Sequence, residues 1–220
     1  MKHPSSAYFS MRYISDPRRD AVWREVCRYL QARYIPGDSK ILDLGAGYCS
    51  FINNIKGRER HALDYEPKTS VYGGEGVQFH IQTCTRLVDF RDEEFDIAFA
   101  SNLFEHLSRE ETALSLREIH RVLRPGGKLV VLQPNFRYSY KRYFDDYTHL
   151  QAFSHTGLCD LLCAYQFEVV DVEPRFLPFS FKGGLPAWPI LVRLYLRSPI
   201  KPLAGQMLVV ARKGIPYVEP

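Results

Sequence analysis

The sequence contains no apolar run long enough to cross a membrane, because none of its hydrophobic stretches approaches the roughly 20 residues that a spanning helix requires. Its beginning, MKHPSSAYFSMRY, lacks the apolar centre of a signal peptide. These two absences favour a cytoplasmic protein. Internal repeats and low-complexity tracts are also missing, and 220 residues with 45% hydrophobic and 25% charged composition fit a single domain over residues 1–220.

The sequence also lacks paired cysteines and a strong charge of either sign. Its five cysteines form no C-x-x-C pair. They are Cys27, Cys49, Cys84, Cys159 and Cys163. We therefore expect reduced, mostly buried thiols and no metal site. The net charge of +4 allows an anionic partner but does not require nucleic acid.

What the sequence does contain is a glycine turn at the end of an apolar strand. Residues 41–51 read ILDLGAGYCSF. Gly45 and Gly47 have no Cβ and let the backbone approach a ligand, and a helix that begins near Cys49 would offer unpaired N–H groups. The pattern predicts a strand, a tight turn and a helix around a nucleotide-like cofactor.

The acidic residue in this stretch distinguishes between two kinds of cofactor. A dinucleotide fingerprint needs a third glycine where this chain has Ser50, so a nicotinamide oxidoreductase is the weaker interpretation. Asp43 and the two glycines form the pattern D-x-G-x-G. A carboxylate at that point repels pyrophosphate but can hold a cationic amino group, directly or through water.

A second predicted strand, His61–Tyr65, also ends in acidic residues. Asp64 follows the glycines by about twenty residues, which is where α/β nucleotide sites place the carboxylate that binds both ribose hydroxyls. Glu66 is the alternative for this role, and a solvated loop carboxylate is the plainer interpretation. A third strand is expected at Val77–Gln82.

The middle of the chain predicts two more strands around a helix. The strand Phe95–Asn102 leads into the letters E-H-L, and Ser108 and Glu111 form a capping box that opens a helix. The letters R-P-G-G then precede the strand Lys128–Leu132. Together with the glycine turn and Asp64, this order resembles the class I S-adenosylmethionine (SAM) dependent methyltransferases over residues 38–135, in the small-molecule group of the ubiquinone-pathway enzymes.

The resemblance implies a Rossmann-like α/β fold with a mostly parallel seven-stranded sheet, an antiparallel last strand at Met207–Arg212, and helices on both faces. It implies SAM as cofactor and S-adenosylhomocysteine as product. The cofactor-binding residues that it implies are Asp43, Gly45, Ala46, Gly47, Asp64, Tyr65, Thr83, Cys84 and Asn102. Thr83 stands where the family often has an acidic residue beside adenine, so adenine recognition is expected to use backbone groups near Cys84.

The long connection at residues 135–153 leaves the carboxyl end of a strand and is rich in polar aromatic residues, so we interpret it as a lid over the acceptor site. A hydroxyl acceptor needs a base, for which His149, near Asp146, is the first candidate and His106 the second. The alternative is that either histidine only holds a loop. The D/N-P-P-Y/F/W run of amino-directed methyltransferases is missing, which favours an oxygen or carbon acceptor.

An apolar, aromatic and basic insertion is expected at residues 174–205, between a sixth strand at Phe167–Val172 and the last strand. A helix at Ile190–Arg197 would place Arg193 and Arg197 on one face. Such a segment could lie peripherally on the inner face of the membrane, form a homodimer contact, or cover the acceptor pocket.

The lid and the insertion resemble methyltransferases of bacterial surface-glycan and lipid-linked sugar assembly. We therefore expect O-methylation of a sugar-bearing or lipid-linked small acceptor by in-line transfer, with a small molecule or glycan as partner and no nucleic acid. The alternatives are an RNA methyltransferase, although the basic residues are scattered, and a SAM-binding protein without catalytic activity.

Overall fold

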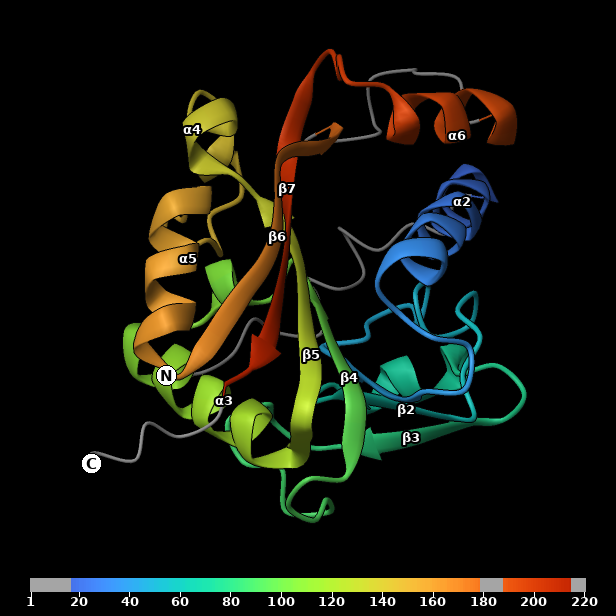
Figure 1. The fold of residues 1–220 in the computed structure, drawn as a ribbon, viewed down its shortest axis with the longest axis vertical. Helices are drawn as coiled ribbons and strands as arrows, with labels where there is room; N and C mark the ends of the chain where they lie inside the picture. The colour runs from blue at the N-terminus through green and yellow to red at the C-terminus, as the bar shows by residue number, and fades with distance from the viewer. Residues whose placement is uncertain (1–16, 179–187, 215–220) are drawn as a thin grey trace.

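The computed structural model describes residues 17–178 and 188–214. A seven-stranded sheet in the order β3-β2-β1-β4-β5-β7-β6 forms its centre (Figure 1). The strands are β1 (Lys40–Leu44), β2 (Glu59–Asp64), β3 (Val77–Ile81), β4 (Phe95–Ser101), β5 (Leu123–Pro134), β6 (Phe167–Pro178) and β7 (Ala204–Lys213). β7 is antiparallel to both of its neighbours, and the other neighbouring pairs are parallel. The predicted sheet is confirmed.

Helices cover both faces of the sheet. They are α2 (Pro17–Arg33), α3 (Arg109–Val122), α4 (Phe136–Ser139), α5 (His155–Ala164) and α6 (Pro189–Arg197), with short 3₁₀ turns η1 (Pro67–Tyr72), η2 (Phe104–His106) and η3 (Tyr143–Asp145). α3 and α5 pack on the face that includes Val131, whereas α2 and α6 pack on the face that includes Val130 (Figure 1). This alternation follows from the two-residue period of a strand. None of the described helices combines the length and the apolar character needed to cross a bilayer.

The predicted helix after the glycine turn is wrong, because the described chain between β1 and β2 forms consecutive turns instead. Cys49 has a φ of 55°, in the left-handed region, which interrupts a regular helix at its first turn. The side-chain amide of Asn54 donates to the Ser50 carbonyl (3.0 Å), and that of Asn53 donates to the Tyr72 carbonyl (2.8 Å). Side chains of this kind compete with the helical backbone pattern.

The predicted insertion is shorter than residues 174–205, because the last two strands extend into it. β6 continues to Pro178 and β7 begins at Ala204, so their pairing resumes beyond an irregularity after Glu173. Phe176 is fully buried beside α2, which explains why this part of the chain stays in the sheet. Residues 179–187 of the insertion lie outside the described residues. The predicted helix in the insertion is confirmed as α6.

Arg193 of α6 pairs with Glu25 of α2, with 2.9 Å between Nε and Oε2. Glu25 is buried, and its hydrogen bond from Arg193 lowers the pKa of its carboxyl group, against the opposing effect of burial. Val192 and Leu196 of α6 are buried in the same cluster as the core residues of α2. Arg193 therefore docks α6 onto α2.

Candidate functional site

Two buried carboxylates lie at the carboxyl ends of neighbouring parallel strands. Asp43 is near the end of β1 and Asp64 ends β2, and their side chains are 3% and 5% exposed. Burial raises the pKa of Asp43 well above its usual range, and the charge of Asp64 raises it further, while the Ile52 N–H partly opposes both. Burial also raises the pKa of Asp64. A cationic ligand would therefore be stabilised at the carboxyl ends of β1 and β2.

The glycine turn is tied to the end of β2 by hydrogen bonds. The Gly47 N–H donates to Oδ2 of Asp64 (2.9 Å), and the Glu66 N–H donates to its Oδ1 (2.9 Å). The Ala46 N–H donates to the Leu63 carbonyl (2.9 Å). The chain after β1 therefore bends around the Asp64 carboxylate, and the polar backbone of the turn lies at the strand ends.

Gly45 brings this turn into contact with the loop after β4. Its φ of 65° lies in the left-handed region, and a Cβ added there would lie 3.0 Å from Cδ1 of Leu103. Any larger residue would be strained and would press on Leu103. The glycine turn after β1 and the loop that follows β4 therefore meet at one edge of the sheet.

The other predicted cofactor residues follow β2, β3 and β4 along the same edge. Tyr65 is 37% exposed, and Thr83 is exposed with its Oγ1 accepting from the Thr85 N–H (2.9 Å). Cys84 is buried against α3, where Ser115 donates to its Sγ, and burial raises the pKa of its thiol to about 11. Asn102 directly follows β4 with a φ of 49°, a left-handed conformation that asparagine tolerates.

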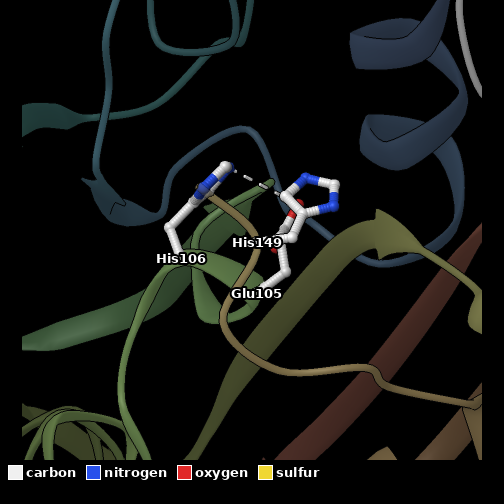
Figure 2. A group of neighbouring side chains, drawn as sticks. All are labelled: Glu105, His106 and His149. Atoms are coloured by element: carbon white, nitrogen blue, oxygen red, sulfur yellow. Dashed lines mark ion pairs between the residues drawn. The ribbon is translucent and has the colours of Figure 1, made fainter. Parts of the chain in front are cut away.

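The turn η2 and the lid together form a cluster of Glu105, His106 and His149 (Figure 2). Glu105 is completely buried, and neither of its carboxylate oxygens has a hydrogen-bond partner among the described residues. Burial therefore raises the pKa of Glu105 to about 8. His106 Nε2 lies 4.0 Å from Oε1 of Glu105, and the two imidazole centres lie 4.9 Å apart. These residues bring a carboxyl group and two imidazoles to one point.

A chain of hydrogen bonds determines which nitrogen of His106 carries the proton. Nδ1 of His106 lies 3.0 Å from Oγ1 of Thr148 and 3.3 Å from the Thr148 carbonyl oxygen. The Thr148 hydroxyl donates its own proton to Asp146 Oδ1 (2.7 Å). Both Thr148 oxygens therefore act as acceptors, so Nδ1 carries a proton, and Nε2 is the nitrogen on the side of Glu105. Asp146 thus acts on His106 through Thr148.

The lid is attached to the β4 loop next to this cluster. The Leu150 N–H donates to the Glu105 carbonyl (2.7 Å), and the Gln151 side chain donates to the Leu107 carbonyl (2.9 Å). Tyr143 is buried, its hydroxyl donates to the Gln151 carbonyl (2.7 Å), and its ring lies 4.6 Å from that of His149. These contacts hold His149 beside His106.

Comparison with known proteins finds a matching family over the middle of the chain. Residues 42–131 match a family described as a methyltransferase domain. This part of the chain is similar to the methyltransferase domain family, and the seven-stranded sheet has the Rossmann-like fold of class I SAM-dependent methyltransferases. The matched residues include the second half of β1 and all of β2, β3 and β4, and hence Asp43, Asp64 and the η2 turn. No curated protein matches the sequence.

Solved structures share the fold of this chain at low sequence identity. A SAM-dependent methyltransferase from Archaeoglobus fulgidus has a TM-score of 0.69 and 19% identity, over 94% of this chain and 98% of that one. A methyltransferase from Haloferax volcanii, in complex with the Trm112 methyltransferase activator, has a TM-score of 0.66 and 15% identity, over 91% and 92%. The [4+2]-cyclase SpnF has a TM-score of 0.62 and 22% identity, over 87% and 82%.

The residues of this site fit SAM as a cofactor. SAM carries two cationic groups, a sulfonium and an ammonium, and Asp43 and Asp64 are two buried carboxylates whose mutual repulsion a cation relieves. Gly45 has a left-handed backbone in close contact with Leu103, so this turn presents main chain, not side chain, to a ligand. The donor set therefore suits a cationic nucleoside better than a pyrophosphate.

Three further polar residues near this site were not predicted from the sequence. Glu105 belongs to the E-H-L letters that carried the family resemblance, so its position next to His106 was a usable signal. Thr148 gave no signal, because its contact with His106 depends on how the lid packs. Gln133 near the end of β5 is fully buried, and neither polar atom of its amide has a partner among the described residues.

Proposed function

We propose that this methyltransferase transfers the methyl group of SAM to a hydroxyl of a sugar-bearing or lipid-linked small acceptor. The observation that carries this proposal is the cluster of Glu105, His106 and His149, because a hydroxyl must lose a proton before or during transfer. The contact between Gly45 and Leu103 links the cofactor turn to the loop that carries this cluster.

On the cofactor side, Asp64 binds the ribose hydroxyls of SAM and Asp43 binds its amino group. Each Asp64 oxygen accepts a backbone N–H, and a carboxylate has further acceptor sites for the ribose hydroxyls. The backbone of Gly45, Ala46 and Gly47 forms the rest of the cradle. Tyr65, Thr83, Cys84 and Asn102 are the residues proposed to surround the nucleoside.

On the acceptor side, the cluster removes the proton of the hydroxyl. SAM supplies an activated methyl group, so that an O–H bond of the acceptor is replaced by an O–CH₃ bond and S-adenosylhomocysteine and one proton are released. His106 offers a nitrogen lone pair on the side of Glu105, and His149 lies against it. Asp146 and Thr148 orient His106 for this role.

The proposed acceptor class rests on exposed apolar surface at the same end of the sheet. α6 and the residue before it expose apolar side chains, and so does the lid. The exposed side chains are Trp188 just before α6, Ile190, Leu191 and Leu194 on α6, and Tyr140, Phe144, Tyr147 and Leu150 on the lid. Both segments lie at the carboxyl end of β5, because α4 follows β5 and α6 precedes the antiparallel β7 (Figure 1). Surfaces of this kind suit an amphipathic ligand.

The experiment that tests this proposal compares acceptor classes with radiolabelled methyl-SAM. Purified protein is incubated with polyprenyl-linked saccharides, with free saccharides and with total RNA. Label in a saccharide fraction, lost in His149→Ala, supports the proposal. Label in RNA supports the alternative of an RNA methyltransferase, and label in none of the fractions with intact SAM binding supports a binding protein without catalytic activity.

A further inference from the structure

We propose that Glu105, His106 and His149 bind one divalent transition-metal cation beside the cofactor turn (Figure 2). Each residue offers one ligand atom: a carboxylate oxygen from Glu105 and a ring nitrogen from each histidine. Cation binding itself does not depend on the proposed hydroxyl transfer, whereas the catalytic role of the cation rests on that function.

The distances bring these ligand atoms within reach of one ion. All three lie within 4.8 Å of one another, and His106 Nε2 lies 4.0 Å from Oε1 of Glu105. Adjacent ligands on an ion with bonds of about 2.1 Å lie about 3 to 3.5 Å apart. Contraction by about 1 Å is within the reach of side-chain rotation, and the backbone of η2 and of the lid can stay in place.

Glu105 is a buried carboxyl group that accepts no hydrogen bond from another residue of the described part of the chain. Both oxygens lack a hydrogen-bond partner among the described residues, although the residue is fully buried. Buried polar groups in folded proteins nearly always have partners, and buried charges are paired or bind metals. A cation that also binds the two imidazoles would supply the missing partner.

His106 already has the surroundings of a metal-bound histidine. Its Nδ1–H faces the Thr148 oxygens, and Thr148 in turn donates to Asp146. Histidines that bind metals almost always donate their second N–H to a carbonyl or carboxylate group, because this bond sets the ring orientation and leaves the other nitrogen available to the ion. Here, the second nitrogen is Nε2, which lies 4.0 Å from Oε1 of Glu105.

The ligand types favour an ion of the first transition series. Imidazole suits Zn²⁺, Fe²⁺, Co²⁺ and Ni²⁺, and carboxylate also accepts Mn²⁺, whereas Mg²⁺ and Ca²⁺ prefer oxygen ligands alone. Three protein ligands leave further positions open on such an ion. The acceptor hydroxyl can occupy one of these positions, where the cation lowers its pKa and the proton leaves to water. With the cation bound, the histidines are its ligands, so they promote the loss of this proton through the ion and do not accept it themselves.

A metal titration of the full-length protein tests this proposal without any acceptor. Protein dialysed against EDTA is titrated with Co²⁺, followed by visible absorption, and with Zn²⁺, followed by calorimetry. We expect a single equivalent of each ion to bind, with a Co²⁺ spectrum typical of nitrogen and oxygen ligands. Glu105→Gln and His149→Gln should abolish this binding, and Thr148→Val should weaken it about 10- to 100-fold.

The matched control is His80→Gln. His80 stacks on His61 elsewhere in the sheet, with 3.1 Å between ring nitrogens, and this pair is the other place where two imidazoles meet in the described part of the chain. The control should keep full binding. Circular dichroism verifies that each variant is folded, and if Glu105→Gln does not fold, His149→Gln and Thr148→Val still test the site.

Three results would overturn the proposal: wild-type protein that binds neither ion, binding that survives Glu105→Gln and His149→Gln, or binding that disappears in His80→Gln. Activity separates the two proposals. Hydroxyl methylation that persists in EDTA with unchanged turnover would refute the catalytic role of the cation but not hydroxyl transfer. Metal binding without transfer to any hydroxyl would refute the proposed function but not the site.

Discussion

The Gly47 N–H donates a hydrogen bond to Asp64 Oδ2 at 2.9 Å, so the turn after β1 and the end of β2 form one unit. The Asp64→Ala variant removes the proposed partner of the ribose hydroxyls. Hydrogen bonds to a charged group contribute about 1.5 to 3 kcal/mol, so SAM affinity should fall about 10- to 150-fold. Calorimetry measures this change. Glu66→Ala is the control, and a larger loss in the control would transfer the ribose role to Glu66.

SAM binding should be linked to the loss of a proton from the Asp43 carboxyl group. Burial raises its pKa in the folded protein, so its contribution to stability is complete below the ordinary aspartate pKa and is lost as the pH rises through the raised value. A cation favours the charged form, so SAM should bind with proton release, more tightly as the pH rises over this range. Calorimetry in two buffers of different ionisation enthalpy counts the protons. The Asp43→Asn variant should release fewer protons when SAM binds. Equal proton release by the variant and the wild-type protein would contradict this assignment.

Gly45 and Gly126 allow a matched test of the cofactor turn. Both have a left-handed backbone, with φ of 65° and 74°, but an added Cβ meets Leu103 at Gly45 and nothing within 4 Å at Gly126. Alanine at either position should lower the free energy of unfolding by about 1 to 2 kcal/mol. Only Gly45→Ala should also weaken SAM binding. Equal SAM affinities in the two variants would show that the turn does not contact the cofactor.

The two histidines of the cluster should affect turnover more than cofactor binding. His149→Ala and His106→Ala should each lower the rate of methyl transfer about 10²- to 10⁴-fold while SAM affinity stays nearly unchanged, because neither residue is assigned to the cofactor. Single-turnover kinetics with saturating SAM measures the effect. A near-normal rate in both variants would leave the histidines as loop-holding residues only.

The exposed face of α6 should contribute to acceptor use and not to folding. Replacing Trp188, Leu191 and Leu194 by serine changes exposed side chains, whereas Val192, Leu196 and Arg193 continue to hold α6 on α2. SAM binding should be unchanged, and the KM for a lipid-linked acceptor should rise. Sedimentation with liposomes and analytical ultracentrifugation distinguish lost membrane contact or a lost homodimer from lost acceptor binding. An unchanged KM would remove this face from the proposal.

Much of the cofactor side could be predicted from the sequence because its signals are local. Asp43, Gly45 and Asp64 lie at the ends of apolar strands, and parallel strands bring such ends to one edge. The capping box at Ser108 is likewise a short-range pattern, and it is confirmed. The helix expected near Cys49 failed because a left-handed residue and side-chain hydrogen bonds outweigh an apolar pattern.

The acceptor side could be predicted only in part. His106 and His149 were named, but their contact depends on the packing of an irregular lid against η2, which leaves no periodic signal in the sequence. The same applies to the Thr148 link between Asp146 and His106. Arg193 and Glu25 are far apart in the chain, so their ion pair could not be recognised before the strands between them were placed.

The most direct test of the central claim, transfer to a hydroxyl, identifies the atom that receives the methyl group. The protein is incubated with SAM that carries ¹³C in the methyl group and with polyprenyl-linked saccharides, and the product is analysed by carbon–proton NMR and mass spectrometry. We expect a labelled methyl group bonded to oxygen on the saccharide, and we expect no such product from the His149→Ala variant. A labelled methyl bonded to nitrogen or carbon, or no labelled product although SAM binds, would contradict this claim.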